Sequence, residues 1–137
     1  MKDPKELLPH REPFLFVDRI EKADLTGIVG YRRFPAREAF FAGHFPRYPV
    51  VPGVILLETM AQVGGAGVKK LGKVKMDGLF LLASMEKVKF RRQVRPGEEV
   101  KVVIRNLRVS NRMVRQSGQV LVGEELAAEA EWLCLVG

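Results

Sequence analysis

The feature that most constrains the fold is a long apolar stretch over residues 54–71. Leu, Ile, Val, Met and Ala occupy nearly every helical face of this stretch, and Gly72 follows as a natural stop. A helix that is apolar all round is buried on all sides. Its interior glycines, Gly64, Gly65 and Gly67, each cost about 1 kcal/mol relative to alanine, which close approach of neighbouring backbone would justify. We therefore expect other elements to wrap around one central helix.

The remaining segments predict strands. Apolar-rich runs separated by turn residues place them at residues 14–20, 28–34, 79–85, 88–94, 99–109, 113–122 and 126–136. The last run alternates cleanly, with one face formed by Ala128, Ala130, Trp132, Cys134 and Val136. We expect an α+β fold in which a curved antiparallel sheet surrounds the helix. Residues 1–137, 47% of them hydrophobic, suit one domain and are too few for two ordinary ones.

Composition narrows the possible chemistry. A single cysteine, Cys134, excludes an internal disulfide, and with two histidines, His10 and His44, no Cys/His zinc pattern can be assembled. Cys134 alternates with inward apolar residues, which favours a core position over a nucleophile. The sequence has no run of about 18 apolar residues for a membrane span, and its start lacks the apolar core of a signal peptide. We expect a cytoplasmic protein.

The net charge is positive, since 23 Lys and Arg against 16 Asp and Glu give +7. This charge suits an acidic or phosphorylated partner without choosing among nucleic acid, membrane surface and acidic protein. A basic run flanks Phe90 and alternates at strand spacing, which predicts one positive stripe made of Lys87, Lys89, Arg91, Arg92 and Arg95. Such a stripe is usually a solvated face, but it is our candidate docking surface for an acidic partner.

Two isolated polar residues and a glycine are candidates for catalysis. His44 lies on a turn lined by apolar groups, where an imidazole could take or give a proton. A core histidine bonded to a backbone carbonyl is an equally good interpretation. Gly53 opens the helix, where free N–H groups could hold a developing oxyanion. A plain tight turn after Pro52 explains the same glycine.

Glu58 lies on the helix among apolar neighbours, where a carboxyl group could act as an acid. From the residues alone we favour the alternative, in which Glu58 faces solvent on a thin polar stripe with Gln62 and Lys69. His10 is interpreted as a turn residue and not as a second base.

Five motifs together resemble one enzyme family along most of the chain. They are Leu-Leu-Pro-His-Arg-Glu-Pro-Phe-Leu-Phe-Val-Asp-Arg at 7–19, Phe-Phe-Ala-Gly-His-Phe-Pro at 40–46, Pro-Val-Val-Pro-Gly-Val at 49–54, Leu-Glu-Thr-Met-Ala-Gln at 57–62, and Lys-Phe-Arg-Arg-Gln-Val-Arg-Pro-Gly-Glu at 89–98. The chain resembles the (3R)-3-hydroxyacyl-acyl carrier protein dehydratases of bacterial type II fatty acid synthesis. These are hot-dog folds, in which an antiparallel sheet wraps a long helix.

The resemblance implies a site and an assembly. His44 and Glu58 would be the catalytic pair, meeting across a homodimer interface with one residue from each subunit, and the Gly53 N–H would hold the thioester carbonyl. The resemblance thus reverses our interpretation of Glu58. Three dimers commonly form a hexamer in this family, and no metal or bound cofactor is required. The substrate would arrive on phosphopantetheine attached to an acidic acyl carrier protein.

Apolar and basic residues of the chain supply further candidates for binding such a substrate. Our candidates for an acyl tunnel are Phe45, Met60 and Phe80, and those for carrier docking are Lys89, Arg91, Arg92 and Arg95. Glutamate at 58, where related dehydratase/isomerases normally carry aspartate, disfavours isomerase activity. The sequence departs from the family pattern at Arg37, Ala39, Ser84, Glu86 and Gln93.

Two other functions fit parts of the sequence. A hot-dog thioesterase would present the same helix N-terminus and one carboxylate to a thioester. A basic module that binds nucleic acid or acyl chains is the non-enzymatic alternative. Aromatics make up only 8% of the chain and do not interleave with the basic residues as base stacking requires, which counts against nucleic acid.

Overall fold

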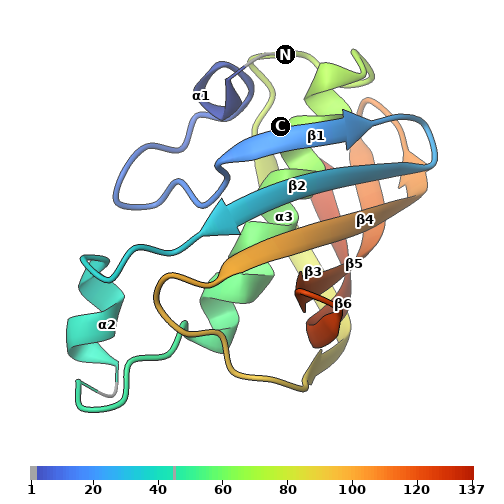
Figure 1. Ribbon diagram of the computed structural model, residues 1–137. Helices are drawn as coiled ribbons and strands as arrows, with labels where there is room; N and C mark the ends of the chain where they lie inside the picture. Colours follow the sequence, from blue (N-terminus) through green and yellow to red (C-terminus); the bar gives the residue numbers. More distant parts are fainter. Residues whose placement is uncertain (1–2, 45) are drawn as a thin grey trace.

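Six antiparallel strands form one curved sheet. The computed structural model describes residues 3–44 and 46–137. The strands are β1 (Arg19–Ala23), β2 (Gly27–Arg33), β3 (Phe80–Phe90), β4 (Glu99–Val109), β5 (Met113–Val122) and β6 (Glu125–Val136). They lie in the order β1-β2-β4-β5-β6-β3, so β1 and β3 are the edges. Figure 1 shows the sheet curving around one long helix, which confirms the expected α+β hot-dog architecture.

The long helix is α3 (Gly53–Lys70), within one residue of the predicted bounds. Gly72, at a φ of 73°, follows its end as expected. The interior glycines are explained by side chains of the sheet and not by neighbouring backbone. A Cβ atom on Gly64 would lie 2.1 Å from Oε1 of Gln116, and one on Gly67 would lie 2.5 Å from the side chain of Ile28. These glycines therefore let the sheet approach the helix closely.

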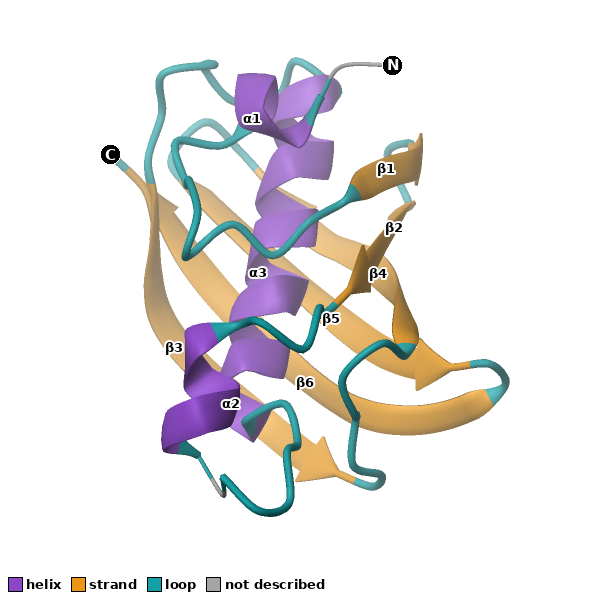
Figure 2. Cartoon of the chain, turned by 60° about the vertical axis from the view of Figure 1, so that its left-hand side comes forward, coloured by secondary structure: helices purple, strands orange, loops and turns teal. Residues whose placement is uncertain are grey.

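Two short helices were not expected from the sequence. The first, α1 (Pro4–Leu7), is capped by Asp3, whose carboxylate accepts from the Lys5 N–H at 2.9 Å. The second, α2 (Ala39–Gly43), has no side-chain cap. Helices of four and five residues are too short to produce a visible hydrophobic period. In Figure 2 they lie near opposite ends of α3.

The predicted strand over residues 14–20 is largely wrong. Strand β1 begins at Arg19, and three consecutive residues before it, Leu15, Phe16 and Val17, are buried. Three buried neighbours cannot alternate between the two faces of a strand. Figure 2 shows this segment crossing α3 on the side away from the sheet. We call residues 8–18 the strap.

The strand β3 is continuous where two separate segments were predicted. Bulges between Leu82 and Ser84 and between Glu86 and Lys89 shift its register against β6 and obscure the pattern in the sequence. In β6 the predicted alternation is confirmed, since Ala128, Ala130, Trp132 and Cys134 are all buried while Val136 is partly buried.

Candidate active site

Gly53 begins α3 and lies against an aromatic ring. Ile55 and Leu56 donate their N–H groups to the Pro52 carbonyl, whereas the N–H groups of Gly53 and Val54 donate to no backbone carbonyl in the described chain. A Cβ atom on Gly53 would lie 2.7 Å from the Phe90 ring. The glycine therefore allows the close approach of the Phe90 ring. It leaves two N–H groups at the positive end of the helix dipole.

Glu58 lies in the second turn of α3 and is not a solvent-facing residue. Its side chain is 26% exposed, and its Oε2 accepts a hydrogen bond from Nε2 of Gln62 at 2.9 Å. The polar stripe considered above exists, but Gln62 and Lys69 are 2% and 3% exposed. The stripe therefore points into the molecule, which overturns the solvated-face interpretation.

A small cavity of about 40 Å³ opens beside Glu58. It is lined by Leu8, His10, Glu58, Ala61, Gln62, Phe80, Leu82 and Cys134. Burial, with a smaller contribution from the Glu58 carboxylate, raises the pKa of the Cys134 thiol to about 11. A thiol with this pKa is almost entirely protonated at neutral pH and is a poor nucleophile. This agrees with the prediction that Cys134 belongs to the core.

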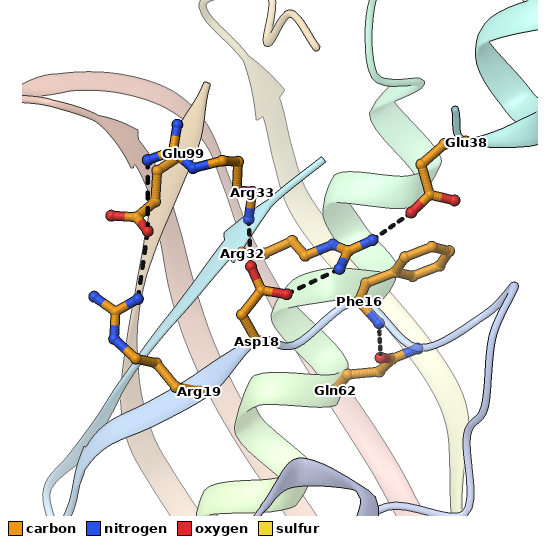
Figure 3. Close-up of polar contacts among 8 residues, drawn as sticks. All are labelled: Phe16, Asp18, Arg19, Arg32, Arg33, Glu38, Gln62 and Glu99. Atoms are coloured by element: carbon orange, nitrogen blue, oxygen red, sulfur yellow. Dashed lines mark hydrogen bonds and ion pairs between the residues drawn. The ribbon is translucent and has the colours of Figure 1, made fainter. Parts of the chain in front are cut away.

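Gln62 connects the strap to Glu58. Its Oε1 accepts from the Phe16 N–H at 2.8 Å, and its Nε2 donates to the Phe14 carbonyl at 2.9 Å; Figure 3 shows the bond to Phe16. These backbone partners fix which end of the amide faces Glu58, because the N–H of Phe16 can only donate and the carbonyl of Phe14 can only accept. The strap thus orients the donor that holds the Glu58 carboxyl group.

His44 is held by α2, which is itself fixed to the sheet. The His44 N–H donates to the Phe40 carbonyl at 2.8 Å and caps the helix. At the other end of α2, the Arg32 guanidinium on β2 bonds the Glu38 carboxylate and also donates to Asp18 of the strap, the latter at 2.9 Å. Figure 3 shows Arg32 between these two carboxylates. No residue of the α2 segment lines the described cavity beside Glu58.

The chain between His44 and α3 is fastened to the segment after β3. Val51 donates its N–H to the Val94 carbonyl at 2.8 Å, and the Tyr48 hydroxyl donates to Oε1 of Gln93 at 2.8 Å. Gln93 is one of the departures from the family pattern, and it serves here as an anchor for this loop. The other departures are exposed or partly exposed, and Glu86 accepts from Arg115 at 3.1 Å.

The basic residues around Phe90 do not form a regularly spaced stripe. Lys87 has a φ of 55° within the bulge of β3, and Arg91, Arg92 and Arg95 lie beyond the end of that strand. Arg92 is paired with Glu98 at 2.9 Å and Glu125 at 3.3 Å, and Arg91 with Glu129 at 2.9 Å. Arg95 lies over the Tyr48 ring at 4.4 Å. Lys89 and Arg95 form no ion pair within residues 3–44 and 46–137.

The three tunnel candidates have different outcomes. Phe80 lines the cavity beside Glu58. Met60 is fully buried in the hydrophobic core and does not line that cavity, because it lies on a different face of α3. Phe45 lies outside the described residues.

His10 is the functional candidate that the sequence interpretation missed. It lies shortly after two buried leucines, Leu7 at the end of α1 and Leu8 in the strap. Its Nε2 lies 3.6 Å from Oε2 of Glu58. Its neighbour Arg11 donates to the Leu8 carbonyl at 2.8 Å and so holds the turn. The prolines at positions 9 and 13 indicate an extended path, but nothing in the local sequence shows which helix the path crosses.

The part of the chain that the structure describes offers neither a metal-binding cluster nor a membrane-spanning helix. No group of three or more His, Cys, Asp or Glu side chains in residues 3–44 and 46–137 is arranged to hold a metal ion. No helix in that part of the chain combines the length and hydrophobicity needed to cross a bilayer.

Comparison with known proteins assigns the family. A model of the FabA-like domain matches residues 8–131. The chain belongs to the FabA-like family. Among its members, the chain is 42% identical over 134 residues to a 3-hydroxyacyl-acyl-carrier-protein dehydratase FabZ of Desulforamulus reducens, with 97% of this chain and 94% of the relative covered. It is also 42% identical to the FabZ of Pelotomaculum thermopropionicum, with 96% and 94% covered.

Solved structures similar to this FabA-like chain support the fold. The dehydratase heterocomplex ApeI:P from Xenorhabdus doucetiae matches with a TM-score of 0.83 at 14% identity, covering 100% of this chain and 92% of the other. A putative thioesterase, a phenylacetic acid degradation-related protein from Ralstonia eutropha, matches with a TM-score of 0.66 at 17% identity over 85% and 83%. At these identities the likeness shows the hot-dog fold alone.

Proposed function

We propose that this protein dehydrates (3R)-3-hydroxyacyl-acyl carrier protein to the trans-2-enoyl product in fatty acid biosynthesis, with residues 1–137 acting as one dehydratase domain. The similarity to FabZ relatives over nearly the whole chain carries this proposal. The position of Glu58 supports it, because a carboxyl group held by an amide donor beside a cavity suits proton transfer.

The reaction needs an acid, a base and an oxyanion site. His44 removes the proton at C2 of the thioester, and the electron pair of that C–H bond forms the C2–C3 double bond. Glu58 protonates the hydroxyl at C3, which leaves as water. The N–H groups at Gly53 and Val54 hold the enolate-like carbonyl oxygen at the start of α3. These groups come from the chain alone, so no metal or bound cofactor enters the mechanism.

The geometry of α3 supports a site shared between two subunits. Gly53 and Glu58 are five positions apart, which places them roughly 140° apart around the helix axis. A single bound thioester would not easily contact both the Gly53 N–H and the Glu58 carboxyl group of the same helix. It would more easily contact the Gly53 N–H of one subunit and the Glu58 carboxyl group of another. The cavity of about 40 Å³ beside Glu58 is also small compared with ligand sites of roughly 300–1,000 Å³. A second copy of the chain would complete it.

The edge strand β3 is the surface that such a copy would cover. It pairs with β6 on one side only, and it carries exposed Leu81, Leu82 and Phe90, at 58%, 48% and 54%. Exposed apolar edge strands are normally covered. Because Phe80 and Leu82 also line the Glu58 cavity, pairing of β3 with its copy would bring the partner to that cavity. We further propose a hexamer of three such dimers, located in the cytoplasm.

The charged groups near Gly53 suit an acidic carrier protein. A groove at the start of α3 is lined by Gly53, Val54, Phe90, Arg91, Arg92 and Gln93. Arg91 and Arg92 are paired with carboxylates. We therefore assign direct contact with the carrier to Lys89 and Arg95, which form no ion pair in the described part of the chain. The paired arginines would instead shape the groove along which phosphopantetheine enters.

The test is to measure turnover of a short 3-hydroxyacyl thioester by the ultraviolet absorbance of the enoyl product. We expect His44→Ala and Glu58→Gln each to lower kcat by about a thousandfold, within the range for removal of an acid or base. Both variants should keep the wild-type circular dichroism spectrum. Rates near wild type in both folded variants would contradict the proposal. Release of free thiol from a saturated acyl thioester would instead identify a thioesterase.

A further inference from the structure

The strap brings a second histidine to the carboxyl group of Glu58. Nε2 of His10 lies 3.6 Å from Oε2 of Glu58, the same oxygen that accepts from Gln62 at 2.9 Å. The contact is slightly longer than a hydrogen bond, as is common for catalytic contacts before substrate binds. Two nitrogen atoms thus converge on one carboxyl oxygen from one side.

The surroundings of His10 favour its neutral form with the proton on Nε2. Burial lowers the pKa of His10, and Lys69 and Arg11 lower it further, while the Glu58 carboxylate opposes them. Nδ1 is buried and has no hydrogen-bond partner among the described residues. An unpartnered nitrogen is less costly as an acceptor without a proton than as an N–H donor. The ring also stacks beside Phe14, at a centroid distance of 6.3 Å, which limits its rotation.

We propose that His10 is a positioning residue for Glu58, and that its Nε2–H donates to Oε2 together with the Gln62 amide. Two donors on Oε2 leave no place for a proton on that oxygen. The catalytic proton of Glu58 is therefore carried on Oε1, the oxygen that neither donor contacts. This inference rests on the proposed function, because it assigns His10 a role through the acid of that reaction.

The kinetics of two variants distinguish the effect of the His10 N–H donor from the effect of packing by the His10 ring. His10→Phe keeps a ring beside Phe14 but has no N–H, whereas His10→Gln keeps an N–H donor. We expect His10→Phe to lower kcat about tenfold, the effect of roughly one hydrogen bond to a charged group, with KM within about twofold. His10→Gln should recover most of the lost kcat. A His10→Phe kcat within twofold of wild type, or equal losses in both variants, would overturn the proposal.

A measurement on the wild-type chain tests the proposed role of His10 without relying on the His10 variants to fold. Because the sequence contains only two histidines, long-range ¹H–¹⁵N spectra of the imidazoles can be assigned with His44→Ala. We expect the Nε2–H tautomer for His10 at pH 7.5, and the Nδ1–H tautomer would overturn the proposal. Wild-type protein that dehydrates no thioester would refute the proposed function, while the spectrum still reports the contact between His10 and Glu58.

Discussion

Two buried amide side chains, Gln62 and Gln116, join α3 to the structure around it. Gln62 bonds the strap and Glu58. Gln116 donates to the Gly64 carbonyl at 3.2 Å and to Oδ1 of Asn106 at 2.9 Å, and it accepts from the Trp132 indole at 3.2 Å. Each amide supplies hydrogen-bond partners to buried backbone or indole groups that would otherwise have none. Precise placement of α3, and with it Glu58, depends on these contacts.

Gly64→Ala tests the contact between α3 and the sheet. The new Cβ atom would lie 2.1 Å from Oε1 of Gln116, so it would displace the amide and break its bonds. We expect the free energy of unfolding in urea to fall by about 2–3 kcal/mol.

Gly43→Ala is the matched control, since no atom of the residues that the structure describes lies within 4 Å of the added Cβ atom. Alanine is also the better helix former. This variant should be as stable as wild type or more stable by up to about 1 kcal/mol. Equal stability of the two variants would show that Gln116 adjusts freely.

At the scale of elements, α2 is the least supported segment near the site. It has five residues and no side-chain cap, and Arg32 bonds Glu38 just before it begins. Ala39 is the first residue of α2. Proline fits the first position of a helix, and Glu38 has a ψ of 132°, which a following proline favours.

We therefore expect Ala39→Pro to stabilise the protein by about 0.4–1 kcal/mol, because it restricts the unfolded chain. The midpoint of thermal unfolding should rise by roughly 1–5 °C. Ala42→Pro is the control at an equally exposed alanine of the same helix, where the ring would clash with the carbonyl four residues earlier. That variant should lower the midpoint, and a lower midpoint for Ala39→Pro as well would contradict the described start of α2.

Long elements with a strong pattern were predictable from the sequence, and short or irregular ones were not. The bounds of α3, β4 and β5 were predicted within one residue because each has a sustained helical or strand pattern. Residues 14–18 of the strap were predicted as part of a strand, since this segment is apolar. The strap backbone instead bonds Gln62, which lies 46 positions from Phe16. Hydrophobicity alone does not reveal such a long-range side-chain partner.

The candidate site was predictable only in part for the same reason. Gly53 and Glu58 occupy the expected positions on α3. Phe80 lines the cavity beside Glu58, and its place in an acyl tunnel stays a prediction. The contact between His10 and Glu58 was not predicted because it depends on how the strap crosses α3. The prediction of a regularly spaced positive stripe was wrong. The ion pairs of Arg91 and Arg92 and the bulge in β3 arise only in the folded sheet, so the sequence pattern does not show them.

At the scale of the whole molecule, the central claim is that two copies of the chain build each site. In one subunit, the cavity beside Glu58 is small and open toward the edge strand β3, and it is not lined by the segment that carries His44. A dimer that covers this edge would account for the exposed leucines, the cavity and the separation of Gly53 from Glu58.

The most direct test mixes two inactive variants. His44→Ala and Glu58→Gln subunits are unfolded together in equal amounts, refolded, and assayed for dehydration of a 3-hydroxyacyl thioester. If each site takes His44 from one subunit and Glu58 from the other, every mixed dimer contains one intact site. The mixture should then recover about a quarter of the wild-type activity, because half of the dimers are mixed and each has one of two sites. A mixture that forms mixed dimers but stays as inactive as the separate variants would contradict the shared site.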